Sequence, residues 1–134
     1  MSVLGLCLAL AATPSVQAFV PGEHFTLAWM HSIEHVRWEE DYDVIGPPAR
    51  LVAPAARIKG SAAGMEPPPD AVLRDGWFHY TPTVRSPTVL PLTRSEFTAD
   101  YELCTPAGCQ PMSHWLASDH GVTLMRACEG PTTR

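Results

Sequence analysis

The chain has 134 residues, of which 46% are hydrophobic and 17% are charged, and its formal net charge is −5 at pH 7. This length suffices for one small domain with a single hydrophobic core. An acidic chain with one lysine and no basic cluster argues against nucleic acids and anionic membrane surfaces as partners.

Residues 1–18 have the composition of an export signal. A nearly all-apolar run is followed by Pro14, and Val16 and Ala18 occupy the −3 and −1 positions of a cleavage site. We expect residues 1–18 to be a cleaved signal peptide and residues 19–134 to form a single periplasmic, or otherwise extracytoplasmic, β-rich domain. In the alternative, residues 1–18 stay uncleaved and anchor the protein to the inner membrane, although the apolar run is short for a bilayer span.

The whole chain has 14 prolines and 9 glycines, and beyond residue 18 short alternating runs lie between these breakers. Alternation of apolar and polar residues is typical of half-buried strands. The sequence therefore predicts an all-β fold, a small antiparallel β-sandwich or partly open barrel of about eight short strands. The clearest strands are 25–29 and 36–44, and the weaker ones are 50–58, 71–80, 88–92, 97–104, 109–115 and 122–127.

The segment from Trp29 to Tyr42 predicts a hairpin with two different faces. Its register gives four cross-strand pairs on one apolar face: His31 with Val36, Trp29 with Trp38, Leu27 with Glu40, and Phe25 with Tyr42. The opposite face carries Arg37, Glu39, Asp41 and Asp43, and we interpret it as a solvated edge strand. Polar groups on the apolar face require a reason, so His31 and Glu40 are the first candidates for a binding site.

A carboxylate flanked by Trp38 and Tyr42 is costly to bury without a partner. We expect Glu40 to have a basic partner, for which Arg57 and Lys59 are available. A raised pKa of Glu40 is the functional alternative.

Two further segments carry weaker signals. The loop 60–66 is rich in glycine and alanine, and we interpret it as a tight crossing between strands rather than an anion-binding nest. His31, Glu34 and His35 have the spacing of metal ligands on a helix. We expect a turn here instead, which would not place the three side chains together, so a metal site is disfavoured. Ser32 is not a nucleophile candidate, because neighbours on a strand point to opposite faces.

Cys104 and Cys109 bracket a four-residue turn that contains proline and glycine. Such a turn places the cysteines opposite each other, so we expect a disulfide that stabilises the fold by roughly 2 kcal/mol. The alternative is a metal site formed by Cys104, Cys109, His114 and His120, which the spacing and an oxidising compartment disfavour. Removal of a leader would leave Cys128 without an assigned partner, as a buried thiol or one that exchanges with the other two.

The hairpin and loop motifs resemble a bacterial family known only as domain of unknown function 1850. The resemblance rests on His31-Ser32-x-Glu34, Trp38-x-Glu40-x-Tyr42, Gly64-Met65 after small residues, and Gly76-Trp77. Members are small exported or membrane-associated proteins, and some are encoded beside tripartite solute transporters. The resemblance implies an accessory role in solute uptake, with no established activity.

Three hypotheses follow. The first is a non-enzymatic binding domain whose partner is a transporter subunit or a small ligand, with no cofactor or metal. Its candidate site residues are His31, Ser32, Glu34, Trp38, Glu40, Gly64, Met65 and Glu66. The second is a small hydrolase or metal-dependent enzyme that uses His31 with Glu34 or Glu40. The third is a purely structural domain, whose motifs only stabilise the fold.

Overall fold

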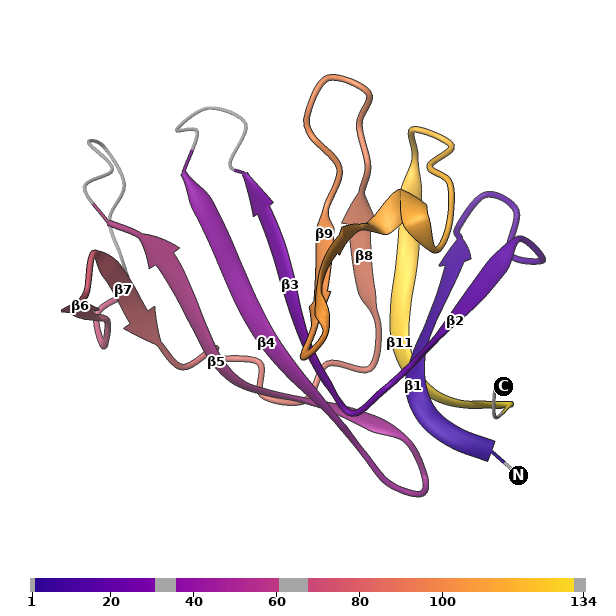
Figure 1. Ribbon diagram of the computed structural model, residues 1–134, viewed down its shortest axis with the longest axis horizontal. Helices are drawn as coiled ribbons and strands as arrows, with labels where there is room; N and C mark the ends of the chain where they lie inside the picture. Colours follow the sequence, from indigo (N-terminus) through magenta and orange to yellow (C-terminus); the bar gives the residue numbers. More distant parts are fainter. Residues whose placement is uncertain (1, 31–35, 61–67, 132–134) are drawn as a thin grey trace.

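The computed structural model describes residues 2–30, 36–60 and 68–131 (Figure 1). These residues form eleven strands and one short 3₁₀ helix, η1, at Met112–His114. The strands are β1 Ser2–Leu10, β2 Gln17–Pro21, β3 His24–Met30, β4 Arg37–Ile45, β5 Arg50–Lys59, β6 Val72–Arg74, β7 Trp77–Tyr80, β8 Leu90–Thr93, β9 Glu102–Thr105, β10 Gly108–Pro111 and β11 Val122–Pro131. The prediction of an all-β fold is confirmed.

The strands form two antiparallel sheets, in the orders β2-β1-β11-β8 and β10-β9-β3-β4-β5-β7-β6. Their inner faces share one hydrophobic core, to which Leu6 and Met125 contribute from one sheet and Leu27 and Leu103 from the other. Of the two predicted architectures, a sandwich and a partly open barrel, the structure is the sandwich. There are more than eight strands because residues 71–80 form a separate hairpin, β6–β7, and residues 2–21 add another, β1–β2.

The N-terminal residues have an unexpected place in the first sheet. β1 pairs with β11 on one side and β2 on the other, and its Leu6 and Leu8 are fully buried. Cleavage after Ala18 would remove β1 together with one half of a Cys7–Cys128 disulfide. Cleavage of residues 1–18 stays a prediction, and it would require the first sheet to form without β1.

Membrane anchoring was the alternative for the same segment. In the part of the chain that the structure describes, no helix is both long and apolar enough to cross a membrane.

The predicted register of the β3–β4 hairpin is confirmed for three pairs. Phe25 lies opposite Tyr42, Leu27 opposite Glu40, and Trp29 opposite Trp38. The fourth pair includes His31, which is outside the described residues. The interpretation of β4 as an edge strand is wrong, because β5 pairs with its other side along most of its length.

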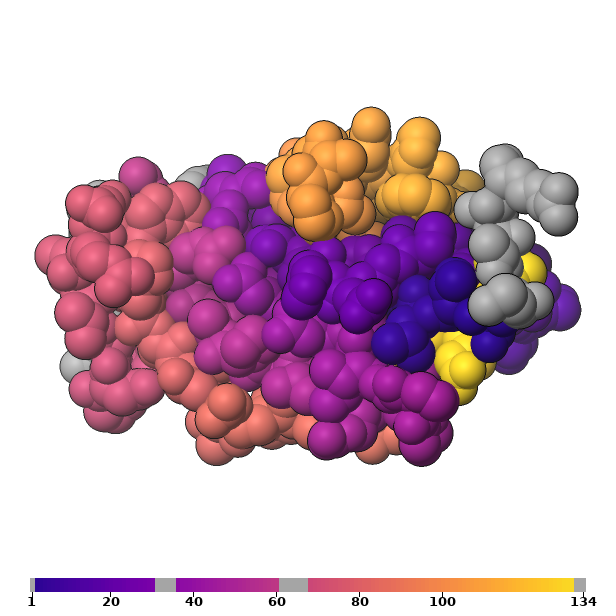
Figure 2. All heavy atoms as spheres, turned by 60° about the horizontal axis from the view of Figure 1, so that its bottom comes forward, coloured from indigo at the N-terminus to yellow at the C-terminus, as the bar shows by residue number. Residues whose placement is uncertain are grey.

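A buried ion pair fastens the connection between β8 and β9. Arg94, whose side chain is 1% exposed, donates two hydrogen bonds to Asp100, at 3.0 and 2.9 Å, and one to the Thr123 hydroxyl at 3.1 Å. Asp100 also accepts hydrogen bonds from the backbone N–H groups of Tyr101 and Ser113. The orange segment that includes β9 and β10 forms a ridge beside strand β3, with which β9 pairs (Figure 2).

Candidate functional site

Glu40 lies on the inner face of the larger sheet, in a row of cross-strand neighbours. Residues directly opposite each other in an antiparallel pair share a face. The row across the sheet is Leu103, Leu27, Glu40, Ala56 and Tyr80. Leu103, Leu27 and Ala56 are buried, whereas Glu40 and Tyr80 are half-buried. Glu40 is thus the one carboxylate in an otherwise apolar and aromatic row.

The hydrogen-bond partner of Glu40 comes from its own strand. The Tyr42 hydroxyl donates to Glu40 Oε1 at 2.7 Å, because residues two apart on a strand share a face. Burial raises the pKa of Glu40, and the hydrogen bond from Tyr42 offsets part of that rise. Burial likewise raises the pKa of Tyr42, and the bonded carboxylate adds to the shift. Of the two expectations for Glu40, a basic partner and a raised pKa, the structure supports the raised pKa.

Arg57 and Lys59, the expected basic partners of Glu40, lie elsewhere. Arg57 pairs directly with Glu39, which places it on the outer face of the sheet. The Lys59 ammonium lies 5.1 Å from the centre of the Trp77 ring. The expectation failed because the register between β4 and β5 puts Ile58, not Arg57, on the face of Glu40.

Aromatic rings surround this part of the inner face. Trp29 and Trp38 stack with their centroids 5.9 Å apart, and Tyr101 lies at the same distance from Trp29 on a tilted plane. Burial raises the pKa of both Tyr80 and Tyr101, and the negative charge of Glu40 raises each further. The rings therefore lie within electrostatic reach of the carboxylate. We call Trp29, Trp38, Glu40, Tyr42, Tyr80 and Tyr101 the Glu40 cluster.

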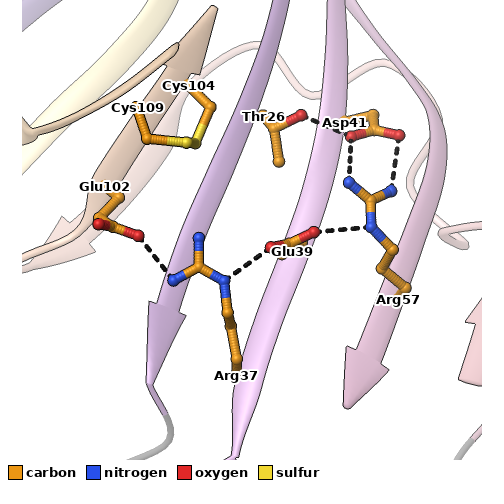
Figure 3. A network of polar contacts seen from close by, with 8 residues as sticks. All are labelled: Thr26, Arg37, Glu39, Asp41, Arg57, Glu102, Cys104 and Cys109. Atoms are coloured by element: carbon orange, nitrogen blue, oxygen red, sulfur yellow. Dashed lines mark hydrogen bonds and ion pairs between the residues drawn. A yellow bond between two sulfur atoms is a disulfide. The ribbon is translucent and has the colours of Figure 1, made fainter. Parts of the chain in front are cut away.

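The outer face of the same strands carries an ion-pair network (Figure 3). Arg57 holds Asp41 with two hydrogen bonds, at 2.9 and 3.2 Å, and reaches Glu39 at 2.7 Å. Arg37 bridges Glu39 at 2.7 Å and Glu102 at 2.6 Å. These side chains are partly buried, so the interpretation of this face as a solvated edge is wrong.

A pocket of about 460 Å³ opens beside this network. Its polar lining includes Thr26, which donates a hydrogen bond to Asp41 at 2.7 Å, and the pair formed by His24 and Asp43 at 2.9 Å. The hydrogen bond to Asp43 raises the pKa of His24. Every charged group in this lining already has a protein partner, so the pocket offers a ligand no uncompensated charge.

The predicted disulfide between Cys104 and Cys109 is confirmed: the two residues are cross-strand partners with Cα atoms 3.9 Å apart. Their oxidation removes both thiolates from the alternative metal site with His114 and His120. Cys128, which the sequence left without a partner, forms a second disulfide with Cys7. Among the described residues, no group of three or more His, Cys, Asp or Glu side chains is placed to hold a metal ion.

Of the predicted site residues, Trp38 and Glu40 lie together on the inner face. The others fall outside the described residues: His31, Ser32, Glu34, Gly64, Met65 and Glu66. The sequence reasoning missed Tyr80 and Tyr101. No local signal places them beside Glu40, because β7 pairs with β5 and the chain at Tyr101 enters β9 beside β3.

Comparison with known proteins gives one match. Residues 25–112 match the family described as "Domain of unknown function (DUF1850)". This range runs from the start of the β3–β4 hairpin to η1 and contains all six residues of the Glu40 cluster. No curated protein and no solved structure matches the chain. Because the match covers well over half of the sequence, the chain belongs to the DUF1850 family.

Proposed function

We propose that this protein is a non-enzymatic, extracytoplasmic accessory domain of a solute-uptake system, and that the Glu40 cluster is the surface with which it binds its partner or ligand. The observation that carries the proposal is Glu40 itself. It is a half-buried carboxyl group among aromatic rings, hydrogen-bonded by Tyr42, and it has a raised pKa. Two disulfides are compatible with an oxidising compartment outside the cytoplasm.

The chemistry of the cluster suits a particular kind of contact. A carboxylate in a partly desolvated setting is a strong acceptor for an N–H donor or a cation. Aromatic faces attract the same positively charged groups. A donor that approaches Glu40 would offset the desolvation that now raises its pKa, so binding and ionisation of Glu40 are coupled. The resemblance to transporter-associated proteins adds a transporter subunit as the partner to test first.

The experiment uses affinity capture of transporter subunits from the source organism with three full-length proteins: wild type, Glu40→Gln and Glu129→Gln. Glu129 is the matched control, since it is exposed and lies on β11, in the other sheet. We expect wild type and Glu129→Gln to retain the same transporter subunit and Glu40→Gln to lose it. Equal capture by all three proteins, or capture of no transporter subunit by any, would refute the proposal.

A purely structural role for the cluster makes a different prediction. In that case Glu40→Gln and Tyr42→Phe would lower the melting temperature and leave any binding by the folded protein intact. Under our proposal, Glu40→Gln keeps its fold by near-UV circular dichroism while it loses its partner.

A further inference from the structure

A second pocket lies at the seam between the two sheets, and the charged residues of its lining are all basic. It has a volume of about 310 Å³. Its lining comes from the start of β5, the segment before β8, and β11, and consists of Ala49, Arg50, Leu51, Ser86, Pro87, Thr88, Arg126 and Ala127. We call it the seam pocket. It contains two arginines and no acidic residue, although the chain as a whole has a net charge of −5.

The seam pocket forms where the pairing between β8 and β11 ends. β8 begins at Leu90, which pairs with Met125, so Arg126 and Ala127 lie beyond the reach of that strand. The preceding segment turns instead toward β5 and runs beneath it in Figure 1. The gap between β11 and this segment is the pocket.

The wall formed by residues 85–88 is held firmly to β5. Ala53 N–H donates to the Arg85 carbonyl at 2.7 Å, and the Ser86 hydroxyl donates to the Leu51 carbonyl at 2.6 Å. The Arg85 guanidinium donates to the Ala53 carbonyl at 3.3 Å. Three hydrogen bonds therefore fix the wall without using the Thr88 hydroxyl or either arginine of the lining.

The two arginines carry charge that the protein does not neutralise. Arg37, Arg57 and Arg94 all have carboxylate partners, whereas neither Arg50 nor Arg126 has an ion-pair partner among the described residues. Two guanidinium groups that line one small pocket repel each other, and an anion between them would reverse that interaction. Arginine also binds carboxylates with two parallel hydrogen bonds.

We propose that the seam pocket binds a small organic carboxylate, with Arg50 and Arg126 as its anion-binding residues. The apolar lining from Leu51, Pro87 and Ala127 favours an anion with a short hydrocarbon body over an inorganic ion. The volume is at the lower end of the range for small-molecule pockets, which begins at about 300 Å³. The site shares no lining residue with the Glu40 cluster, so we expect variants of that cluster to leave it unchanged.

The test is a ¹H–¹⁵N NMR titration of the full-length protein with succinate in chloride-free buffer of low ionic strength. We expect saturable shifts confined to the amides of Leu51, Ser86, Arg126 and Ala127. Arg50→Gln and Arg126→Gln should each weaken binding about tenfold to a hundredfold, the range for losing a charged hydrogen-bond partner. Arg74→Gln is the matched control, an exposed arginine on β6 that is also without an ion pair among the described residues, and it should bind like wild type.

Several results would overturn the proposal. These are shifts that do not saturate, equal weakening by Arg74→Gln, and wild-type binding by both Arg50→Gln and Arg126→Gln. Phosphate that binds as tightly as succinate would refute the assignment to an organic carboxylate. Should either glutamine variant fail to fold, Arg126→Lys keeps the charge but loses the planar donor pair, and it should bind more weakly than wild type.

Discussion

The Cys7–Cys128 disulfide connects β1 to β11 and closes a loop with a sequence separation of 121 residues. Cys104–Cys109 closes one with a separation of only 5. A crosslink restricts the unfolded chain more as its loop grows. The chain-entropy relation gives about 5 kcal/mol for the long loop and about 2 kcal/mol for the short one at 25 °C.

We expect Cys7→Ala/Cys128→Ala to lose about 3 kcal/mol more unfolding free energy than Cys104→Ala/Cys109→Ala. The measurement is urea denaturation of both double variants and of wild type. The m-value should also rise for the first variant, since its unfolded chain becomes less compact. Domains of this size have only about 5–15 kcal/mol of stability, so a Cys7/Cys128 variant that is unfolded at 25 °C fits the same expectation. Equal losses, or a larger loss for the short loop, would refute the reasoning.

Thiol titration of the denatured, unreduced protein tests whether residues 1–18 remain in the mature chain. With both disulfides formed, no thiol reacts. Cleavage after Ala18 would remove Cys7 and leave Cys128 as one reactive thiol for each chain. Intact mass spectrometry of the same sample gives the cleavage site directly, and a mature chain that begins at residue 19 would contradict the sheet order described above.

Three other predictions concern single positions. Asp100→Ala should cost about 3–5 kcal/mol in urea denaturation, because it leaves the buried Arg94 guanidinium without its anion; a loss below 1 kcal/mol would show that the pair is not needed. Gly130→Ala should cost about 1–3 kcal/mol in the same assay, since a Cβ there would lie 2.6 Å from the Phe19 ring; an unchanged midpoint would contradict this. The folded-state pKa of Glu40 is raised above its ordinary value of 4.5. The stability that this shift contributes is therefore fully present below pH 4.5 and is lost as the pH rises through the folded-state pKa. In thermal melts, Glu40→Gln should be more stable than wild type at pH 7 and should lose that advantage near pH 4.

The β3–β4 hairpin shows what the sequence could predict. A short turn between two alternating runs leaves few registers, and each register assigns every side chain to a face. Trp29 opposite Trp38 and Leu27 opposite Glu40 follow from that constraint alone. The disulfide at Cys104 and Cys109 was predictable for the same reason, because it depends on a local turn.

Long-range pairing is where the sequence reasoning failed. The β4–β5 register contains an irregularity between Asp41 and Asp43, which alternation does not reveal. The expected pairing of Arg57 with Glu40 failed because β5 places Arg57 opposite Glu39, on the other face of the sheet. Alternation also does not reveal the order of the strands, so β4, which is a central strand, was interpreted as an edge strand.

The N-terminal strand illustrates a deeper ambiguity. Leu4, Leu6, Leu8 and Leu10 have the period of a strand, but the residues between them are also uncharged. A strand covered on both faces reads as a continuous apolar run, and so does the apolar core of a signal peptide. Composition does not separate the two; in this fold the segment pairs with β11 and Cys7 bonds to Cys128, and the thiol titration above tests whether the segment is kept.

The two faces of β4 should respond differently when a carboxylate is neutralised. On the outer face Glu39 serves both Arg37 and Arg57, so a neutral side chain there weakens two ion pairs and should destabilise the fold. On the inner face Glu40 has a raised pKa, which means that its ionised form costs stability at neutral pH. If Glu40→Gln is the more stable protein, as predicted above, then stability is not the reason for a carboxylate at this position. We expect Glu39→Gln to unfold more easily than wild type. We expect Glu40→Gln to unfold less easily but to lose its partner. The two results together would locate the function on the inner face.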